Sequence, residues 1–291
     1  MSEFSNLKEK IKQREAIEEN LKEVKHRLVV MSGKGGVGKS TITASLGTAF
    51  VHLGFSVGIV DSDMHGPSIP KILGVDKLRG TIQGDENFIY PLEINKNLRI
   101  ISLDLLIENK DTPIIWRGPL KMKMITDFLE KVKWGSLDFL LFDLPPGTGD
   151  EPLSIAQTLP SNDGVIIVTT PQEVALHSVR KSIKFAQDLK MPVLGIIENM
   201  SSFICPHCNN EVDIFGKGTA KNAADDFGIR YFGEIPIDPQ ISKRGDSGEI
   251  PDFNDKNSIT TQRFLEIAES IVEILNKNAN RRFQDENSNR K

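Results

Sequence analysis

The stretch Val29-Val30-Met31-Ser32-Gly33-Lys34-Gly35-Gly36-Val37-Gly38-Lys39-Ser40-Thr41 decides how the rest of the chain is interpreted. From Gly33 to Ser40 it fits the pattern G-x-x-x-x-G-K-[S/T], with an apolar run before it and a helical pattern after it, which is the context of a phosphate-binding loop. Glycines let backbone N–H groups turn toward phosphate oxygens, and the following helix directs the positive end of its dipole at the same anion. In such a loop Lys39 reaches the β- and γ-phosphates, and the Ser40 hydroxyl binds Mg²⁺. The residues predicted to contact the nucleotide are Gly33, Lys34, Gly35, Gly36, Val37, Gly38, Lys39, Ser40 and Thr41.

The first lysine of the loop carries further information. Lys34 occupies a position that the general pattern leaves free, and it places a second cation beside the phosphates. The sequence K-G-G-V-G-K-S from Lys34 to Ser40 resembles the deviant Walker A loop of the MinD/ParA/nitrogenase-iron-protein group. That resemblance implies that Lys34 reaches across a dimer to the nucleotide of the partner chain.

Length and composition limit the class of protein. The chain has 291 residues, 38% of them hydrophobic, and a formal net charge of −4, which suits one large α/β domain or at most two small ones. The mild acidity argues against a nucleic-acid-binding surface, and no apolar run approaches the roughly 18 residues of a membrane span. The start of the chain is polar and lacks the apolar core of a signal peptide. We therefore expect a cytoplasmic protein that binds neither membrane nor nucleic acid.

The hydrophobic pattern predicts a parallel sheet. Short apolar runs separated by segments of helical spacing indicate strands that helices bury on both faces. The expected fold class is α/β, a mostly parallel central sheet with helices on both faces, of the P-loop NTPase type. Strands are expected at 28–31, 57–60, 99–103, 137–144, 164–169, 193–197 and 230–232, hairpin material within 75–103, and helices at 7–25, 38–53, 119–132, 174–190, 217–227 and 259–276.

The same pattern divides the chain into three regions. Residues 1–26 carry many charges of both signs and apolar residues near helical spacing, so a charged helical extension is expected there. Residues 27–276 are expected to form the P-loop domain, into which a C-x-x-C segment is inserted. Residues 277–291 are polar and are expected to be disordered.

Three carboxylates stand where predicted strands end. Asp61 and Asp63 close one strand, and Asp143 closes the apolar run 139–142. Open α/β sheets bind ligands beyond the carboxyl ends of their strands, and a carboxylate after four apolar residues is the Walker B pattern for Mg²⁺. Carboxylates at strand ends are also common for structural reasons, but a phosphate loop in the same sheet favours the functional interpretation.

Catalytic roles follow from this placement. Ser40, Asp61 and Asp143 are the candidate ligands of Mg²⁺. Asp63 is the candidate for orienting the attacking water, because phosphoryl transfer depends on positioning more than on a strong base. The segments 61–68 and 143–150 are expected to act as switches that approach and release a γ-phosphate. The predicted catalytic residues are Lys34, Lys39, Asp63 and Asp143.

A second group of candidate ligands is Cys205-Pro206-His207-Cys208. Two thiolates separated by two residues can bind one metal atom or one cluster, but Zn²⁺ and [4Fe–4S] sites usually need four ligands. The chain has only the cysteines Cys205 and Cys208, so a four-thiolate site requires a second copy of the chain, unless His207 or another histidine contributes. A redox role is a further alternative, although redox C-x-x-C pairs open a helix and this pair follows a predicted strand.

Taken together, the motifs resemble those of the Mrp/ApbC family. In the family's order, over roughly 27–275, the chain contains K-G-G-V-G-K-S, D-S-D-M-H-G-P-S from Asp61, W-R-G-P from Trp116, D-L-P-P-G-T-G-D from Asp143, E-N-M-S from Glu198, C-P-H-C from Cys205 and D-I-F-G-K-G from Asp213. The resemblance implies an ATP-binding iron–sulfur cluster carrier, a homodimer that holds a [4Fe–4S] cluster between two C-x-x-C pairs. It also implies that Asn199 and the loop 235–238, with Pro236, contact the adenine. Unlike the eukaryotic cytosolic scaffolds, this chain has no cysteine cluster before the phosphate loop.

The sequence therefore predicts a Mg²⁺-dependent ATPase with a slow basal rate. It would bind a [4Fe–4S] cluster through Cys205 and Cys208 at a dimer interface and pass it to apo iron–sulfur proteins. The alternative is a MinD/ParA-type switch in spatial regulation or partition, which would need a basic amphipathic C-terminal helix or a basic patch. An electron donor like the nitrogenase iron protein would need two well-separated cysteines in each chain.

Overall fold

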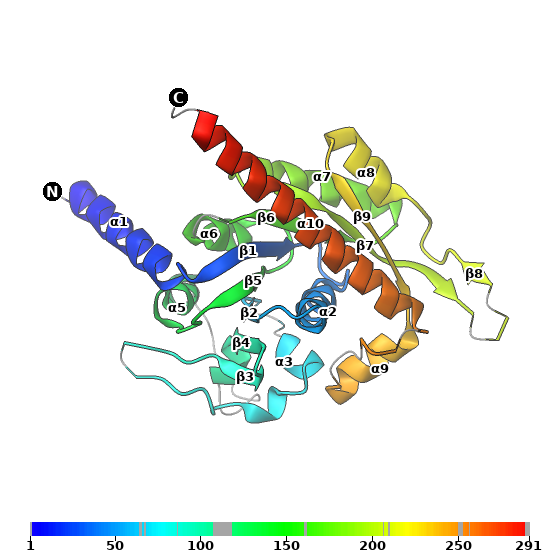
Figure 1. Ribbon diagram of the computed structural model, residues 1–291, viewed down its shortest axis with the longest axis horizontal. Helices are drawn as coiled ribbons and strands as arrows, with labels where there is room; N and C mark the ends of the chain where they lie inside the picture. The colour runs from blue at the N-terminus through cyan, green and yellow to red at the C-terminus, as the bar shows by residue number, and fades with distance from the viewer. Residues whose placement is uncertain are drawn as a thin grey trace.

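A central β-sheet organises the fold, which the computed structural model describes for residues 2–288 apart from 64–65, 67, 86, 107–117, 160–161, 206, 209, 250–252 and 256. Within these residues the strands are β1 (Val24–Met31), β2 (Val57–Asp61), β3 (Leu92–Asn95), β4 (Leu98–Ser102), β5 (Leu137–Asp143), β6 (Gly164–Thr169), β7 (Val193–Ile204), β8 (Glu211–Val212) and β9 (Arg230–Ile237). Their order in the sheet is β3-β4-β2-β5-β1-β6-β7-β8, and β9 also pairs with β7 (Figure 1). The β3–β4 and β7–β8 pairs are antiparallel and the other pairs are parallel, which confirms the predicted mostly parallel sheet.

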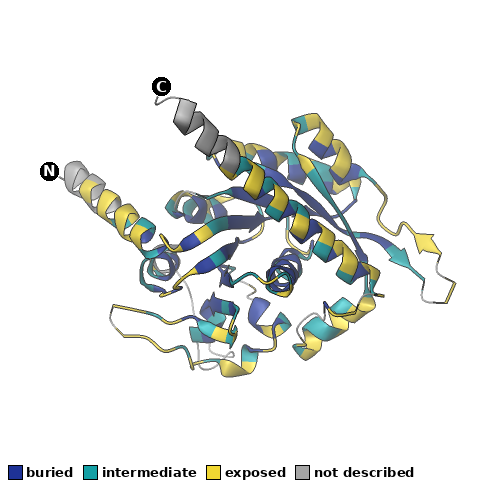
Figure 2. Cartoon of the chain, in the orientation of Figure 1, coloured by how far each residue is buried: buried dark blue, intermediate teal, exposed yellow. Residues whose placement is uncertain are grey.

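Helices cover both faces of this sheet. In the described residues they are α1 (Ser2–Asn20), α2 (Lys39–His52), α3 (Ile69–Ile72), α4 (Leu103–Leu106), α5 (Gly118–Lys131), α6 (Asp150–Thr158), α7 (Glu173–Asp188), α8 (Thr219–Phe227), α9 (Pro239–Ser247) and α10 (Ile259–Ser288). Alternate residues of β1 face opposite cores: Val29 and Met31 join the core with α1, α5, α6, α7 and α8, whereas Leu28 and Val30 join the core with α2, α3 and α10. This two-residue period is that of a strand buried on both sides, and Figure 2 shows the central strands dark blue between the helices.

The N-terminal helix ends earlier than the sequence predicted. It ends at Asn20. Val24, which was expected in the helix, instead pairs with Leu137 of β5, because the chain from Val24 onward forms the edge-to-edge hydrogen bonds of strand β1. Only part of the helix is buried against the domain: Ile17 is 1% exposed, whereas Ile11 is 50% exposed. The described part of α1 around Ile11 therefore lies outside the core.

The C-terminal helix ends later than the sequence predicted. α10 continues to Ser288, so the segment from Lys277 to Ser288 is helical where a disordered tail was expected. No proline or glycine interrupts the segment, and Lys277 forms an ion pair with Glu273 one turn earlier, at 2.6 Å. Neither α10 nor any other helix in the described ranges has the length and apolar character needed to cross a membrane.

The third difference is the length of β7, which runs to Ile204 rather than 197. The polar residues Glu198, Ser201 and Ser202 suggest a loop, yet all three are buried in the structure. The strand continues because β9 pairs with it along one side, a partner that local sequence does not reveal. The sequence also did not predict α6 and α9.

Candidate functional site

The phosphate loop connects β1 to α2 at the carboxyl end of the sheet. Gly36 and Gly38 have φ angles of 77° and 79°, the left-handed backbone that favours glycine. A Cβ atom at Gly38 would also displace the side-chain amide of Asn199, which approaches the loop closely at this position. The loop lines a cavity of about 250 Å³, whose walls are residues 34–41 with Ser32, Asp63, Gly66, Ser68 and Pro146. Gly33 does not line this cavity; a Cβ atom there would meet the carbonyl of Ser178 on α7.

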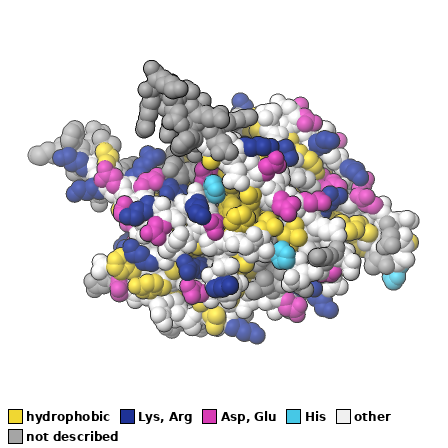
Figure 3. All heavy atoms as spheres, in the orientation of Figure 1, with side chains coloured by type: hydrophobic (Ala, Val, Ile, Leu, Met, Phe, Trp, Pro, Cys, Tyr) yellow, Lys and Arg dark blue, Asp and Glu magenta, His cyan; other side chains and the backbone are white. Residues whose placement is uncertain are grey.

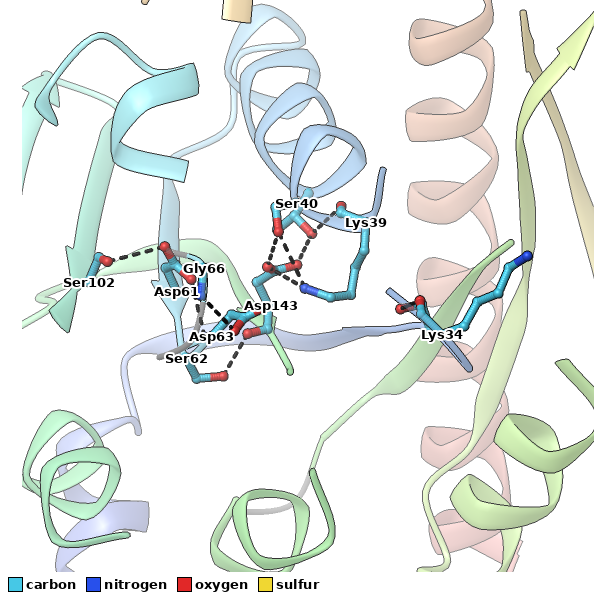
Figure 4. Close-up of polar contacts among 11 residues, drawn as sticks. Lys34, Lys39, Ser40, Asp61, Ser62, Asp63, Gly66, Ser102 and Asp143 are labelled. Carbon is cyan, nitrogen blue, oxygen red and sulfur yellow. Dashed lines mark hydrogen bonds and ion pairs between the residues drawn. The ribbon is translucent and has the colours of Figure 1, made fainter. Parts of the chain in front are cut away.

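Lys39 and Asp143 form a buried ion pair at the centre of the site (Figure 4). Lys39 Nζ lies 2.5 Å from Asp143 Oδ2, and the two side chains are 5% and 0% exposed. The same oxygen accepts a hydrogen bond from the Ser40 hydroxyl at 2.8 Å, and Oδ1 accepts one from Thr43 at 2.5 Å. The Walker B candidate is therefore held directly against the lysine and the serine of the phosphate loop.

Asp61 lies next to Asp143 on the neighbouring strand, as its register partner. Burial, and then the nearby Asp143 carboxylate, raise the pKa of Asp61 to about 8, although Lys39 and the Ser102 hydroxyl at 3.1 Å act in the opposite direction. Two buried carboxylates thus share one ammonium group, an arrangement that favours a further cation. The oxygens of Asp61, Asp143 and Ser40 are hard ligands of the kind that Mg²⁺ prefers, so the residues present fit this ion.

Asp63 lies on the wall of the loop cavity. Its backbone N–H donates to Asp61 Oδ1 at 3.3 Å, and its own Oδ1 accepts from the Gly66 N–H at 3.3 Å. The side chain is therefore held by a local turn close to the phosphate loop. Met64, His65 and Pro67 of the predicted switch 61–68 lie outside the described residues, as do Trp116 and Arg117 of the W-R-G-P motif.

The other predicted switch, 143–150, closes a second wall of the cavity. The Gly147 N–H donates to the Ser32 carbonyl at 2.8 Å, and Pro146 lines the cavity. Gly147 has a φ angle of 93°, so glycine is required for this turn. The segment contacts the phosphate loop through its backbone.

Lys34 points away from the Lys39–Asp143 pair (Figure 4). Its Nζ donates to Gln172 Oε1 at 3.0 Å, and Gln172 immediately precedes α7. Lys34 thus lines the same cavity as Lys39 and Asp63, but within this chain its ammonium group is directed at Gln172 and not at these candidates.

A larger cavity, of about 480 Å³, lies beside α2. Pro236 lines it, together with Thr41 and Ser45 of α2, Phe203 and Ile204 of β7, the start of α9, and Phe253 and Phe264. Asn199, the other predicted adenine contact, does not line this cavity. Its side-chain amide donates to the Val37 carbonyl of the phosphate loop at 2.9 Å.

Cys205 and Cys208 lie in the turn between β7 and β8. Phe203 and Ile204 pair with Val212 and Glu211 in antiparallel register, and the Cys205 N–H donates to the Asn210 carbonyl at 3.0 Å. Cys205 is half-buried and Cys208 is exposed. Hydrogen bonds from the backbone N–H groups of His207 and Cys208 lower the pKa of Cys205, which favours the thiolate that binds metal.

The cysteine turn is not a complete metal site within one chain. Among the described residues, no group of three or more His, Cys, Asp and Glu side chains is placed to hold a metal ion. In the described residues, no histidine of the same chain is therefore placed to bind a metal ion together with Cys205 and Cys208. The turn that carries both cysteines lies at the outer edge of the sheet, because β8, at the far right in Figure 1, is the last strand on that side.

Sequence reasoning did not identify several residues that hold the site together. Thr43 bonds to Asp143, the Ser62 hydroxyl donates to the Asp143 carbonyl at 2.6 Å, and Ser102 and Gln172 contact Asp61 and Lys34. Thr43 follows Lys39 by four residues, one helical turn, which is a usable signal. The other three residues lie at or just beyond strand ends: Ser62 after β2, Ser102 in β4 and Gln172 after β6. A search for polar residues at the carboxyl ends of all predicted strands could therefore have identified them as site residues.

Comparison with known proteins agrees with this geometry. The family model for NUBPL iron-transfer P-loop NTPases matches residues 23–272. The iron–sulfur cluster carrier protein of Methanocaldococcus jannaschii is 46% identical over 257 residues, which cover 88% of this chain and 87% of that protein. A nucleotide-binding protein of Archaeoglobus fulgidus, solved in complex with ADP, is 39% identical with a TM-score of 0.72, and the match covers 84% of this chain and 96% of that one.

A more distant likeness concerns the fold. The cell division ATPase MinD of Pyrococcus furiosus is 25% identical with a TM-score of 0.61, and the match covers 86% of this chain and 99% of that one. This likeness and the mostly parallel sheet confirm the predicted MinD/ParA-like P-loop architecture. On the extent of the family match and the identity to its relatives, the chain belongs to the NUBPL iron-transfer P-loop NTPases.

Proposed function

We propose that this protein is an ATP-hydrolysing carrier that binds a [4Fe–4S] cluster as cargo and transfers it to apo iron–sulfur proteins. The observation that carries the proposal is that one sheet holds both a phosphate-loop site, built around Lys39 and Asp143, and a surface turn with two cysteines. Relatives with high identity over most of the chain are named iron–sulfur cluster carrier proteins, which supports the assignment.

The phosphate-loop site supports hydrolysis of ATP with Mg²⁺. Ser40, Asp61 and Asp143 would hold the ion, which would neutralise charge on the β- and γ-phosphates. Lys39 would then turn from Asp143 to the transferring phosphoryl group, and Asp63 on the cavity wall would orient the attacking water. Since hydrolysis depends on positioning by switches 61–68 and 143–150, the basal rate should be slow until a partner orders them.

The adenine is assigned to the larger cavity. Its volume of about 480 Å³ and its lining of Pro236, Phe253 and Phe264 suit a planar, mostly apolar base. Thr41 lines both cavities, so the proposed phosphate and base pockets are adjacent at the start of α2. Asn199 would act on the nucleotide through the loop, by fixing the Val37 carbonyl.

The cysteine turn supports a homodimer. A cubane cluster has four corners for ligands and one chain offers Cys205 and Cys208, so a second copy supplies the remaining two thiolates. Around the turn, the apolar residues Val212, Ile214 and Phe215 are 49%, 51% and 38% exposed. An apolar rim beside an incomplete site is what a contact between two copies would cover.

The MinD/ParA-type alternative explains less of the molecule. The apolar face of α10 is buried against the domain at Phe264, Ala268 and Ile271, so this described part of the helix is not available as a membrane anchor. On the face shown in Figure 3, basic and acidic side chains are interspersed rather than gathered into a basic patch. We therefore propose a cytoplasmic protein that acts without nucleic acid or membrane.

Anaerobic reconstitution with iron and sulfide tests the proposal. The expected product is a dimer with one [4Fe–4S] cluster, or about two iron atoms per chain, and a broad absorbance at about 400 nm. Cys205→Ala and Cys208→Ala should each lose the iron and still bind ATP. The proposal would be overturned if the wild-type protein binds no iron. It would also be overturned if each dimer binds one colourless Zn²⁺ that is not released to an apoprotein.

A further inference from the structure

The strand β7 connects the phosphate loop to the cysteine turn, and it is irregular between them. Its inner segment, Val193–Asn199, lies between β6 and β9, and its outer segment, Phe203–Ile204, pairs with β8 and β9. Three residues, Met200, Ser201 and Ser202, join the two segments. Opposite them β9 advances only from Ile235 to Ile237, so β7 carries extra residues at this point.

Met200 holds this joint in an unusual backbone conformation. Its φ angle is 58°, in the left-handed region, and in the described residues only Lys190 among the non-glycine residues shares a positive φ. Ser201 is 2% exposed, and its hydroxyl has no hydrogen-bond partner among the described residues. A side chain in left-handed backbone and a buried unpaired hydroxyl are both unfavourable, so the surrounding structure imposes this joint.

Both ends of the joint contact parts of the nucleotide site. On the inner side, Asn199 donates to the Val37 carbonyl, and the Met200 methyl lies close to Gly38. On the outer side, Phe203 and Ile204 line the cavity of about 480 Å³, and Cys205 follows directly. A molecule in the two cavities would therefore contact the phosphate loop, to which Asn199 is hydrogen-bonded, and β7 itself at Phe203 and Ile204, three and four residues beyond Met200.

We propose that Met200 is a rigid joint through which nucleotide occupancy controls the accessibility of the cysteine turn. A nucleotide that fills the larger cavity fixes Phe203 and Ile204, and the left-handed joint keeps this outer segment in register with the phosphate loop. The turn then becomes less accessible when ATP is bound and more accessible when it leaves. This inference rests on nucleotide binding at the proposed site, and it does not depend on which metal or cluster the cysteines hold.

The chain offers a direct readout and a matched control. Cys205 and Cys208 are its only cysteines, so the rate of alkylation by a maleimide reports on this turn alone. Lys190 has the same φ angle of 58° but is exposed, at the start of the connection to β7. Met200→Gly and Lys190→Gly both remove a side chain from left-handed backbone, and only the first loosens the joint. Met200→Asn keeps a side chain that tolerates this backbone.

The experiment measures maleimide alkylation of the metal-free protein with and without ATP and Mg²⁺. In the wild type, saturating nucleotide should slow alkylation by about fivefold or more, the lower end of ordinary coupling between sites. Met200→Gly should bind ATP and lose this difference, whereas Met200→Asn and Lys190→Gly should keep it. Three results would overturn the proposal. They are a wild-type alkylation rate that ATP does not change, a Met200→Gly protein that keeps the difference, and a Lys190→Gly protein that loses it. Iron reconstitution of the same proteins reports separately on the carrier function.

Discussion

The phosphate-loop site and the cysteine turn are built in opposite ways. Asp143, Lys39 and Thr43 are buried and Ser40 is partly buried, and Lys39, Ser40 and Thr43 all donate to the Asp143 carboxylate. The cysteine turn is supported by the two-residue strand β8, and Cys208 is exposed. Buried, fully bonded groups open rarely, whereas short exposed elements open at low free-energy cost. The difference suits a site that must position a reaction and a site that must release its cargo.

The largest expected effect separates the two regions by chemistry. Lys39→Ala removes the ammonium that would face the transferring phosphoryl group, so ATP turnover should fall by about 10³-fold or more. It also leaves Asp61 and Asp143 buried without their cation, and the free energy of unfolding should fall by roughly 3–5 kcal/mol. Turnover and urea unfolding measure the two effects.

The cysteine turn supplies the control for this variant. Iron binding by Lys39→Ala should stay near the wild-type value, because Cys205 and Cys208 share no ligand with the buried pair. Hydrolysis that survives in Lys39→Ala would contradict the assignment of the phosphate loop.

A second prediction asks whether the buried site is complete in one chain. Within the chain Lys34 bonds to Gln172, so we expect it to act on the partner's nucleotide in the dimer. Lys34→Ala and Asp63→Ala should each be inactive alone. When the two are mixed and exchange chains at random, half of the dimers gain one working site, which gives about a quarter of wild-type turnover.

This mixing experiment needs proof of chain exchange. Two affinity tags, one on each variant, will show whether mixed dimers form. If they form and no activity returns, Lys34 acts within its own chain.

A third prediction concerns the apolar rim of the cysteine turn. Ile214→Ser should weaken the dimer by about tenfold to a hundredfold, since an isoleucine buried at an interface contributes on the order of 1.5–3 kcal/mol. Ile11→Ser is the matched control, because Ile11 on α1 is equally exposed, at 50% against 51%. Analytical ultracentrifugation of the reconstituted proteins measures both. Equal dissociation constants for the two variants would place the dimer contact elsewhere.

The smallest expected effect is a change in how the free energy of unfolding depends on pH. It arises from Glu198 of β7, which lies between the two regions. Burial, opposed by a hydrogen bond from the Ala220 N–H at 3.0 Å, raises the pKa of Glu198 in the folded protein, and nearby Glu234 adds to the rise. An acid with a raised folded pKa holds its proton longer when folded, so its stabilising contribution is complete below its unfolded pKa of about 4.3. That contribution is lost as the pH rises through the folded pKa.

Glu198→Gln should therefore flatten the decline of unfolding free energy with rising pH. Urea unfolding at a series of pH values from about 4 upward measures the slope. The same slope in wild type and Glu198→Gln would mean that this carboxyl is ionised in the folded protein as readily as in the unfolded one.

Local sequence was sufficient where an element's own residues determine it. β6 was predicted to the residue, because six consecutive buried residues from Gly164 to Thr169 are bounded by polar turns. The phosphate loop was equally clear, because glycine spacing and Lys39 are requirements of the loop itself. Local sequence failed where a distant partner decides: Val24 became a strand by pairing with Leu137.

The candidate site divides in the same manner. The pairing of Lys39 with Asp143 followed from two motifs, each readable alone. The contact of Lys34 with Gln172 did not, because it joins residues 138 positions apart and neither residue belongs to a pattern that names the other. The bulge at Met200 was also missed, since nothing in E-N-M-S predicts a positive φ angle.

Side chains of β1 alternate between the two cores, and this alternation determines where the protein can tolerate an insertion or a deletion. Removing one residue from β1 would turn Val29 and Met31 toward the core of α2 and α10, and Leu28 and Val30 toward the opposite core. Every later residue would also shift, so the loop glycines would meet the wrong backbone positions. Before β3, residues 83–85 are exposed, and they lie between Ile82 and Ile89, which pack against the cores, so a change of length at these three residues should disturb the cores least. Natural length variation in this family should therefore collect in that segment and be absent from the eight residues that lead into the phosphate loop.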